Sequence, residues 1–265
     1  MGIQKYRYYL ISVFELLGQV RPLSTLLSVF LRQAPEGIKQ ISLPKQDLHF
    51  SVRGAMDIWS VKETFLDRFY ERFGVVIGSG WTIIDIGGGI GDFTTFAARA
   101  ARENRVFAFE PTPESFALLE ANLARNKINN ARGYPQAIWS GEGTLWIDTS
   151  VGEPGQFISH ESTKTEAQGA SVAVPSLSLV QAFEQLEIDR CDLLKMDCEG
   201  AEYPILYQAP NEIFVKIERI VMEYHDNAQG NHTQLRTYLQ QQGYQVQITP
   251  NFVHSDLGYL YACRA

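Results

Sequence analysis

The sequence predicts an α/β fold with a seven-stranded, mostly parallel sheet whose last strand is antiparallel, together with N-terminal helices. From Trp81 onward, apolar segments rich in β-branched residues alternate with segments of helical periodicity. This alternation is typical of parallel strands joined by crossover helices. The last two expected strands, at 244–249 and 257–263, are separated by too few residues for a crossover helix. We therefore expect the last strand to run antiparallel.

Residues 1–75 are expected to form an N-terminal helical and substrate-cap region. Two apolar, aromatic segments with scattered arginines in the first 35 residues predict a pair of helices. These helices either pack on the main domain or lie on a membrane or on another subunit. One or two short strands should follow, and then a helix from about Trp59 to Phe73, in which Phe65, Phe69 and Phe73 recur at helical spacing.

Residues 76–265 are expected to form the second, larger domain. Its first five strands are predicted at 82–87, 105–110, 133–139, 192–197 and 219–225. Helices are predicted at 91–103, 114–126 and 178–187, from about 203, and at 233–242. Between 140 and 170, many turn-forming residues indicate a hairpin and a mobile loop.

A glycine cluster joins the first of these strands to the helix that follows it. The glycines are Gly87, Gly88, Gly89 and Gly91. Free N–H groups at such a helix start favour a negatively charged or hydrogen-bonding ligand, and a nucleotide-like cofactor is the first hypothesis. The dinucleotide pattern G-x-G-x-x-G fails in both registers, and no P-loop is present. An NAD-linked oxidoreductase is therefore disfavoured.

A carboxylate, Glu110, stands at the end of the second predicted strand. In nucleotide-binding α/β folds, an acid at this point accepts hydrogen bonds from the ribose hydroxyls. The alternative is that Glu110 serves the start of the next helix, where Pro111 and Pro113 follow.

Composition narrows the class of partner. A net charge of -7 and a pI near 5.3 argue against nucleic acid and favour a small molecule.

The cysteines Cys191, Cys198 and Cys263 form no C-x-x-C pair, so reduced thiols in a cytoplasm are the simplest interpretation. No apolar run approaches the roughly 20 residues of a transmembrane helix, and we expect a cytoplasmic protein without a transmembrane segment.

Four stretches, "IIDIGGGIGDFTTFAA", "VFAFEPTPESFALLEANLARN", "LLKMDCEGAE" and "VMEYH", resemble the FkbM family of methyltransferases. The third is the most specific, since it matches the family's K-x-D-x-E-G-x-E with Lys195, Asp197, Glu199, Gly200 and Glu202. Gly89 is a departure, because the family usually has Asn there. The resemblance implies the Rossmann-like class I methyltransferase fold, S-adenosylmethionine as cofactor with S-adenosylhomocysteine as product, and usually methylation of a hydroxyl on a sugar, polyketide or similar metabolite.

The resemblance also implies a set of cofactor-binding residues. Asp85, Gly87 and Gly91 would hold the amino-acid end of the cofactor, and Glu110 its ribose. Gln136 and Ala137 would line the adenine. The full set is Asp85, Gly87, Gly88, Gly89, Gly91, Glu110, Pro111, Gln136, Ala137 and Asp197.

Polar residues interrupt the apolar strands at their carboxyl ends, which meet at one edge of a parallel sheet. We expect the catalytic residues Lys195, Asp197, Glu223 and His225 there. His225 is the candidate general base because imidazole titrates near neutrality, with Asp197 as the alternative base or as the group that orients the acceptor. Lys195 would neutralise the acids. Purely structural roles stay open: a histidine that caps the strand end, and a turn and helix N-cap role for Asp197 and Glu199 before the helix at Tyr203.

Several alternatives remain at this point. The carboxylates could hold Mg2+, but nothing in their spacing requires a metal, and none is expected. Besides a hydroxyl, the acceptor could be a carboxyl group, or the chain could be a non-catalytic, cofactor-binding interaction module. Acceptor identity should depend on residues 47–73 and 151–170. A homodimer through the N-terminal helices is a further expectation.

Overall fold

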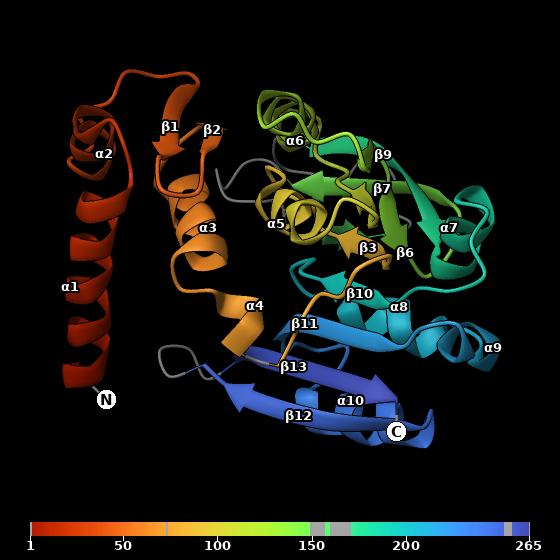
Figure 1. Ribbon diagram of the computed structural model, residues 1–265. Helices are drawn as coiled ribbons and strands as arrows, with labels where there is room; N and C mark the ends of the chain where they lie inside the picture. The colour runs from red at the N-terminus through yellow and green to blue at the C-terminus, as the bar shows by residue number, and fades with distance from the viewer. Residues whose placement is uncertain (1, 73, 149–156, 160–170, 252–255, 265) are drawn as a thin grey trace.

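A seven-stranded sheet, in the order β12-β13-β11-β10-β3-β4-β5, forms the centre of the computed structural model (Figure 1). The structure describes residues 2–72, 74–148, 157–159, 171–251 and 256–264. The strands are Thr82–Ile86 (β3), Arg105–Phe109 (β4), Ala131–Tyr134 (β5), Leu193–Met196 (β10), Arg219–His225 (β11), Tyr244–Pro250 (β12) and Leu257–Arg264 (β13). β13 pairs antiparallel with β11 and β12, and the other neighbouring pairs are parallel. The predicted sheet is confirmed.

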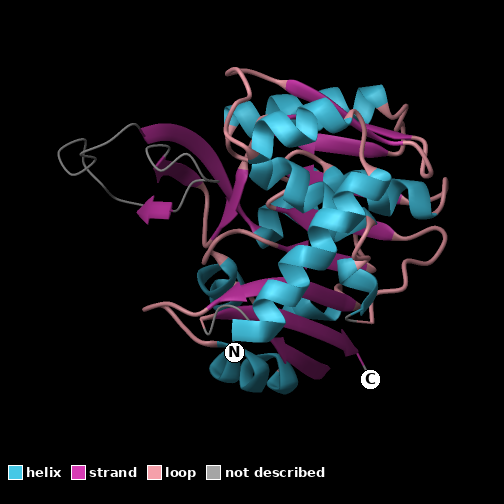
Figure 2. Cartoon of the chain, turned by 90° about the vertical axis from the view of Figure 1, so that its left-hand side faces the viewer, coloured by secondary structure: helices cyan, strands magenta, loops and turns pink. Residues whose placement is uncertain are grey.

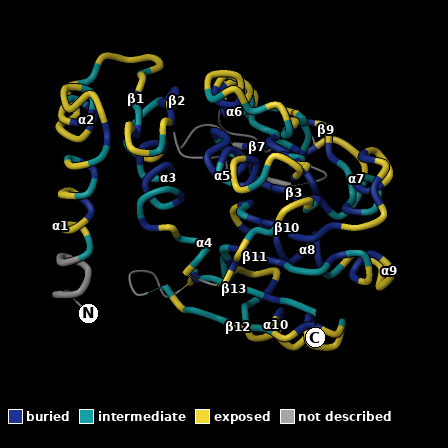
Figure 3. The backbone as a smooth tube through the Cα atoms, viewed as in Figure 1, coloured by how far each residue is buried: buried dark blue, intermediate teal, exposed yellow. Residues whose placement is uncertain are grey.

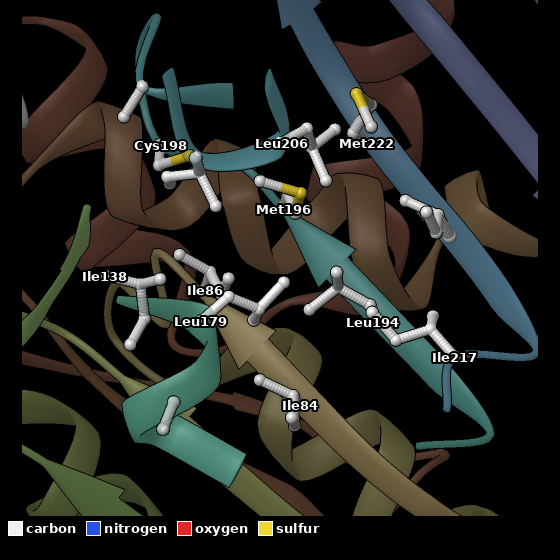
Figure 4. Packing of buried hydrophobic residues seen from close by; sticks show 14 of the residues in the cluster. Ile84, Ile86, Ile138, Leu179, Leu194, Met196, Cys198, Leu206, Ile217 and Met222 are labelled. Atoms are coloured by element: carbon white, nitrogen blue, oxygen red, sulfur yellow. The ribbon is translucent and has the colours of Figure 1, made fainter. Parts of the chain in front are cut away.

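Helices cover both faces of this sheet. Alternate residues of β3 point to opposite faces, as in any strand. Ile83 packs with Phe93 of α5 (Asp92–Ala100), and Leu119 of α6 (Pro113–Arg125) packs on the same face of β4. On the opposite face, Ile84 and Ile86 belong to the same buried cluster as Leu179 (Figure 4). That face carries α7 (Leu179–Gln185), α8 (Glu202–Gln208), α9 (Asn211–Val215) and α10 (His232–Gln241). Burial on both faces explains why these strands are almost continuously apolar.

The predicted third strand, 133–139, is two strands in the structure. β5 ends at Tyr134, and Pro135, which has no N–H to donate to a ladder, follows it. The next segment, β6 (Ala137–Trp139), leaves the central sheet and joins β7 (Gly143–Asp148), β8 (Phe157–Ser159) and β9 (Ser171–Ser178) in a four-stranded sheet. The antiparallel pair of β7 and β8 confirms the expected hairpin. The expected mobile loop falls on residues 149–156 and 160–170, which lie outside the described residues.

The N-terminal region has the two expected helices, α1 (Gly2–Gln19) and α2 (Leu23–Phe30), and the expected short strands, β1 (Lys39–Leu43) and β2 (Leu48–Val52). The prediction of one helix from Trp59 to Phe73 was wrong. The structure has α3 (Ala55–Phe65) and α4 (Phe69–Arg72), with a break at Arg68, whose φ of 50° is incompatible with a right-handed helix.

Hydrogen bonds fix the N-terminal region against α5 and α6. Buried Asn122 of α6 accepts from the Ser51 N–H (2.6 Å) and donates to the carbonyls of Ser51 (3.1 Å) and Ile90 (2.8 Å). The Thr64 hydroxyl of α3 donates to Asp92 at the start of α5. These bonds place α3 beside the carboxyl ends of the central strands.

The turn between β3 and α5 requires glycine most strictly at Gly87. Its φ is +74°, and a Cβ there would lie 1.8 Å from the Asp197 carbonyl oxygen. Gly89 also has a left-handed φ, +53°, but a Cβ there would meet no described atom within 4 Å. The turn therefore packs tightly against the end of β10 at one glycine and is open at the other.

We predict that Gly87→Ala destabilises the fold more than Gly89→Ala. Both variants carry the left-handed backbone cost of about 1–2 kcal/mol, but only Gly87→Ala also forces the β10 backbone to move. Chemical denaturation of the two variants measures the difference. Equal losses of unfolding free energy would show that the contact between Gly87 and Asp197 does not hold the turn.

Candidate active site

The carboxyl ends of β3, β4 and β10 border one pocket. It lies where the strand order reverses between β3 and β10, the usual ligand position in open α/β sheets. It is lined by Ile86, Gly87, Phe109, Glu110, Pro111, Thr112, Ala137, Ile138, Ile147, Asp197, Cys198 and Glu199. We call it the cofactor pocket. Five residues of the predicted cofactor set, Gly87, Glu110, Pro111, Ala137 and Asp197, are among them.

Glu110 is held in a fixed orientation at this pocket. Its Oε2 accepts a hydrogen bond from the Gly89 N–H (2.8 Å), and its Oε1 accepts one from the Thr112 N–H (2.8 Å). Burial raises the pKa of Glu110, and these two backbone donors oppose the rise. Thr112 is the N-cap of α6. Glu110 therefore supports the start of that helix and also lines the pocket, and its contact with a ribose stays a prediction.

Other members of the predicted cofactor set lie outside the pocket lining. Ideal Cβ atoms at Gly88 and Gly91 would meet Leu119 of α6, so these glycines allow close helix packing. The Gln136 Oε1 accepts a hydrogen bond from the Gln185 Nε2 (2.8 Å), and the apolar Ile138 and Ile147 line the pocket instead. The expected contact of Gln136 with an adenine ring is therefore not supported.

Beneath the glycine turn, Lys195 and Asp85 form a buried ion pair between adjacent strands. The Lys195 Nζ is 3.0 Å from the Asp85 Oδ1 and donates to the Gly87 carbonyl at 2.8 Å. The Thr94 hydroxyl donates to the Asp85 Oδ2 at 2.6 Å. Burial lowers the pKa of Lys195, but the charges of Asp85 and Asp197 outweigh it, and the net pKa is raised. Lys195 is thus a cation, and Asp85, fully buried, contacts Lys195 rather than lining the pocket.

His225, at the end of β11, lies between two carboxylates of the K-x-D-x-E-G-x-E motif. Its Nδ1 is 3.2 Å from the Glu202 Oε1, and its Nε2 is 3.5 Å from the Glu199 Oε2. Burial lowers the pKa of His225, but Glu202, Asp197 and Glu199 raise it to a net value of about 10. The ring is therefore an imidazolium at neutral pH. The expectation that it titrates near neutrality is corrected, because the flanking carboxylates stabilise the charged form.

Three carboxyl groups from different parts of the chain interact at this end of the sheet. Asp197, which follows β10, lines the cofactor pocket and offers an oxygen within 4.8 Å of one of Glu223 in β11, and Glu63 of α3 interacts electrostatically with both. We call them the carboxyl wall. Burial, followed by the charge of Asp197, raises the pKa of Glu223 to about 8, although the His225 charge and a Tyr259 hydrogen bond oppose the rise. Burial also raises the pKa of Glu63 to about 7, with the charges of Asp67 and then Asp197 contributing, although the Trp59 hydrogen bond opposes the rise.

Sequence reasoning missed Glu63 and Tyr259. Glu63 accepts a hydrogen bond from the Trp59 Nε1 at 2.8 Å, one turn earlier on α3, and Tyr259 belongs to β13. Neither stands in a recognisable motif. The signal for Glu63 was its place in the segment 47–73, which was expected to shape the acceptor site.

Asp197, Glu223 and His225 each offer one ligand atom, and these atoms lie within 4.8 Å of one another. Two carboxylates and a neutral imidazole can bind a divalent metal, but the imidazolium form of His225 has no free lone pair, so metal binding would require His225 to lose its proton. Cys198 is buried, and burial raises the pKa of its thiol, so it is unsuited to act as a nucleophile.

We predict that Lys195→Met destabilises the protein by about 3–5 kcal/mol, because it leaves Asp85 as an uncompensated buried charge. The double variant Asp85→Asn, Lys195→Met should recover much of this loss. Urea denaturation of the single and double variants measures both effects. A single variant that unfolds like the wild type would refute the structural role of the ion pair.

Comparison with known proteins places this site in a family. Residues 85–246 match the methyltransferase FkbM domain. The chain is 25% identical over 213 residues to Methyltransferase 1 of Beauveria bassiana, a match that covers 74% of this chain and 84% of that protein. It is 26% identical over 190 residues to the 31-O-demethyl-FK506 methyltransferase FkbM of Streptomyces tacrolimicus (62% of this chain, 73% of that protein).

A third relative is the hexuronic acid methyltransferase AglP of Haloferax volcanii, which is 25% identical over 177 residues (66% of this chain, 70% of that protein). The domain match extends from Asp85 in β3 to Val246 in β12 and includes the pocket at the strand ends. The protein belongs to the FkbM family of methyltransferases and is an S-adenosylmethionine-dependent methyltransferase.

Proposed function

We propose that this protein transfers the methyl group of S-adenosylmethionine to a hydroxyl of a small molecule or sugar-like metabolite. The carboxyl wall beside the cofactor pocket is the observation that carries this proposal. A hydroxyl can donate a hydrogen bond to Asp197 or Glu223. A carboxylate acceptor would add another negative charge to these acids, which is unfavourable in a partly buried site.

We further propose how the cofactor lies in the pocket. The Glu110 carboxylate would accept hydrogen bonds from the ribose hydroxyls, and the apolar side chains of Phe109, Ile138 and Ile147 would surround the adenine. Asp197, which lines the pocket and also belongs to the carboxyl wall, would lie near the sulfonium, whose methyl group the cofactor would supply to the acceptor. A positive sulfonium is stabilised by this excess of acids.

The acceptor hydroxyl must lose a proton as its oxygen attacks the methyl group. We propose that Glu223 takes this proton, because its pKa of about 8 lies close to neutrality. Asp197 orients the hydroxyl for in-line displacement, and the His225 imidazolium, held by Glu202, counters the negative charge of the wall. Lys195 supports the glycine turn and takes no part in proton transfer.

Two alternatives keep some support. One is a carboxyl acceptor, since a hexuronic acid, named for one relative, contains both hydroxyls and a carboxyl group. The other is a module that binds the cofactor without transferring methyl groups. The carboxyl wall argues against both, because neither requires a proton acceptor with a pKa near 8 beside the cofactor.

Isothermal calorimetry with S-adenosylhomocysteine tests the cofactor assignment. Glu110→Ala should weaken binding by about 1.5–3 kcal/mol, as expected for the loss of a hydrogen bond to a charged group. Glu114→Ala, which removes an exposed acid one turn further along, should bind like the wild type. Absence of binding by folded wild-type protein would contradict the assignment.

The pH dependence of methyl transfer distinguishes the two candidate bases. With an acceptor found by screening hydroxylated compounds, kcat/KM should rise with pH up to about 8 and then level off, because Glu223 accepts a proton only when ionised. Glu223→Gln should lower the rate by about 10²–10⁴-fold. A rise that continues to about pH 10 and persists in Glu223→Gln would identify His225 as the base.

We propose a reaction without a metal, so a chelator should leave the rates unchanged.

A further inference from the structure

The exposed apolar side chains of this protein are concentrated near its N-terminus. Among the described residues, ten large apolar side chains between 9 and 38 are exposed, against three elsewhere. They are Tyr9, Leu10, Ile11, Val13, Phe14, Leu23, Leu27, Phe30, Leu31 and Ile38. We call this set the N-terminal apolar face. An exposed apolar patch of this kind marks an interaction surface.

Helix α1 is apolar on both of its sides but packs on only one. Its inner residues Ser12 and Leu16 are buried, as is Val20 just after its end, whereas Leu10 and Phe14, one turn apart on the other side, are 59% and 66% exposed. In Figure 1, α1 and α2 lie at the outer edge of the molecule, on the side that Figure 2 turns towards the viewer, and Figure 3 shows the exposed stretches along them. A helix that is apolar on both sides normally has an apolar neighbour on each.

The inner side of α1 is firmly attached, so the outer side faces away from the rest of the protein. The Tyr8 hydroxyl donates to the Asp67 Oδ2 (3.1 Å), and the Tyr8 ring lies 5.8 Å from the Trp59 ring of α3. Asp67 in turn pairs with the fully buried Lys62 (2.6 Å). The inner side of α1 therefore already packs on the protein, and its outer apolar side has no covering neighbour among the described residues.

Charge indicates what covers this face. Residues 1–39, which span this face, contain five basic side chains and two acidic ones, a net charge of +3. The whole chain carries -7, so the remaining residues carry -10. Arg21 and Arg32 are exposed next to the apolar face. Two copies of this face would bring like charges together, whereas an anionic surface with an apolar interior would satisfy both its charge and its apolar side chains.

A cavity beside α2 adds a feature that suits a lipid. It has a volume of about 830 Å3 and lies between residues 29–39 and α6. Its wall is largely apolar, with Val29, Pro35, Ile38 and Leu118, and it also carries charged side chains, namely Arg32, Glu36, Lys39, Arg53 and Glu114. The exposed Ile38 also belongs to the N-terminal apolar face. The cavity is thus continuous with that face.

We propose that the N-terminal apolar face binds the surface of an anionic lipid membrane, with α1 and α2 lying in the headgroup region. None of the described helices is long and apolar enough to span a bilayer. Binding of this type combines burial of apolar side chains with attraction of basic ones to acidic headgroups. The net negative remainder of the protein would be repelled by the same headgroups, which orients the N-terminal face towards the membrane.

Vesicle sedimentation with the full chain tests this proposal. The protein should sediment with vesicles of equal parts phosphatidylcholine and phosphatidylglycerol, less with phosphatidylcholine alone, and less again at high salt. The double variant Leu10→Gln, Phe14→Gln should reduce the bound fraction at least tenfold. Val76→Gln, which changes a 78% exposed apolar residue outside the face, should bind like the wild type. Arg32→Gln should reduce the preference for anionic vesicles.

Binding of S-adenosylhomocysteine serves as the folding check for each variant, and no readout depends on methyl transfer. Failure of this proposal is therefore distinguishable from failure of the proposed activity. Wild-type protein that binds neither vesicle overturns the proposal. If light scattering then shows a dimer that the Leu10→Gln, Phe14→Gln variant converts to a monomer, the face is a contact between two copies of the chain.

Discussion

The buried ion pair between Lys195 and Asp85 is the contact on which the rest of the site depends. It joins β10 to β3 at the point where the strand order reverses, and the Lys195 Nζ also binds the Gly87 carbonyl. Gly87 packs directly against the Asp197 backbone, so the ion pair fixes the glycine turn relative to the end of β10. Two residues beyond Gly87, the Gly89 N–H holds Glu110. Lys195 thus sets the position of Glu110, which we propose binds the ribose, relative to the carboxyl wall.

The second organising constraint is an excess of negative charge. Glu63, Asp197 and Glu223 come from three elements, and the pKa values of Glu63 and Glu223 are raised to about 7 and 8, chiefly by burial. Ionisation of all three carboxyl groups is unfavourable when no cofactor is bound. We propose that a bound sulfonium offsets that cost and thereby couples cofactor binding to activation of the proton acceptor. Because Glu63 belongs to α3, the N-terminal region contributes directly to the electrostatics of the site.

The central sheet was predictable because its strands depend on local signals: continuous apolar runs, a glycine turn and short connections. The expected positions of Glu110 and Asp197 at strand ends followed from the same pattern. The features that the sequence did not predict depend on the backbone conformation of a single residue or on contacts between residues far apart in the chain. Pro135 divides one expected strand, and the left-handed Arg68 divides one expected helix. The imidazolium state of His225 depends on carboxylates brought together by folding.

A crystal structure of the protein with S-adenosylhomocysteine tests the assignment of the cofactor pocket most directly. We expect both ribose hydroxyls within hydrogen-bonding distance of the Glu110 carboxylate, the adenine against Ile138 and Ile147, and the sulfur facing Asp197. A ligand bound instead in the cavity between α2 and α6, or one whose ribose does not contact Glu110, would contradict this account of the site.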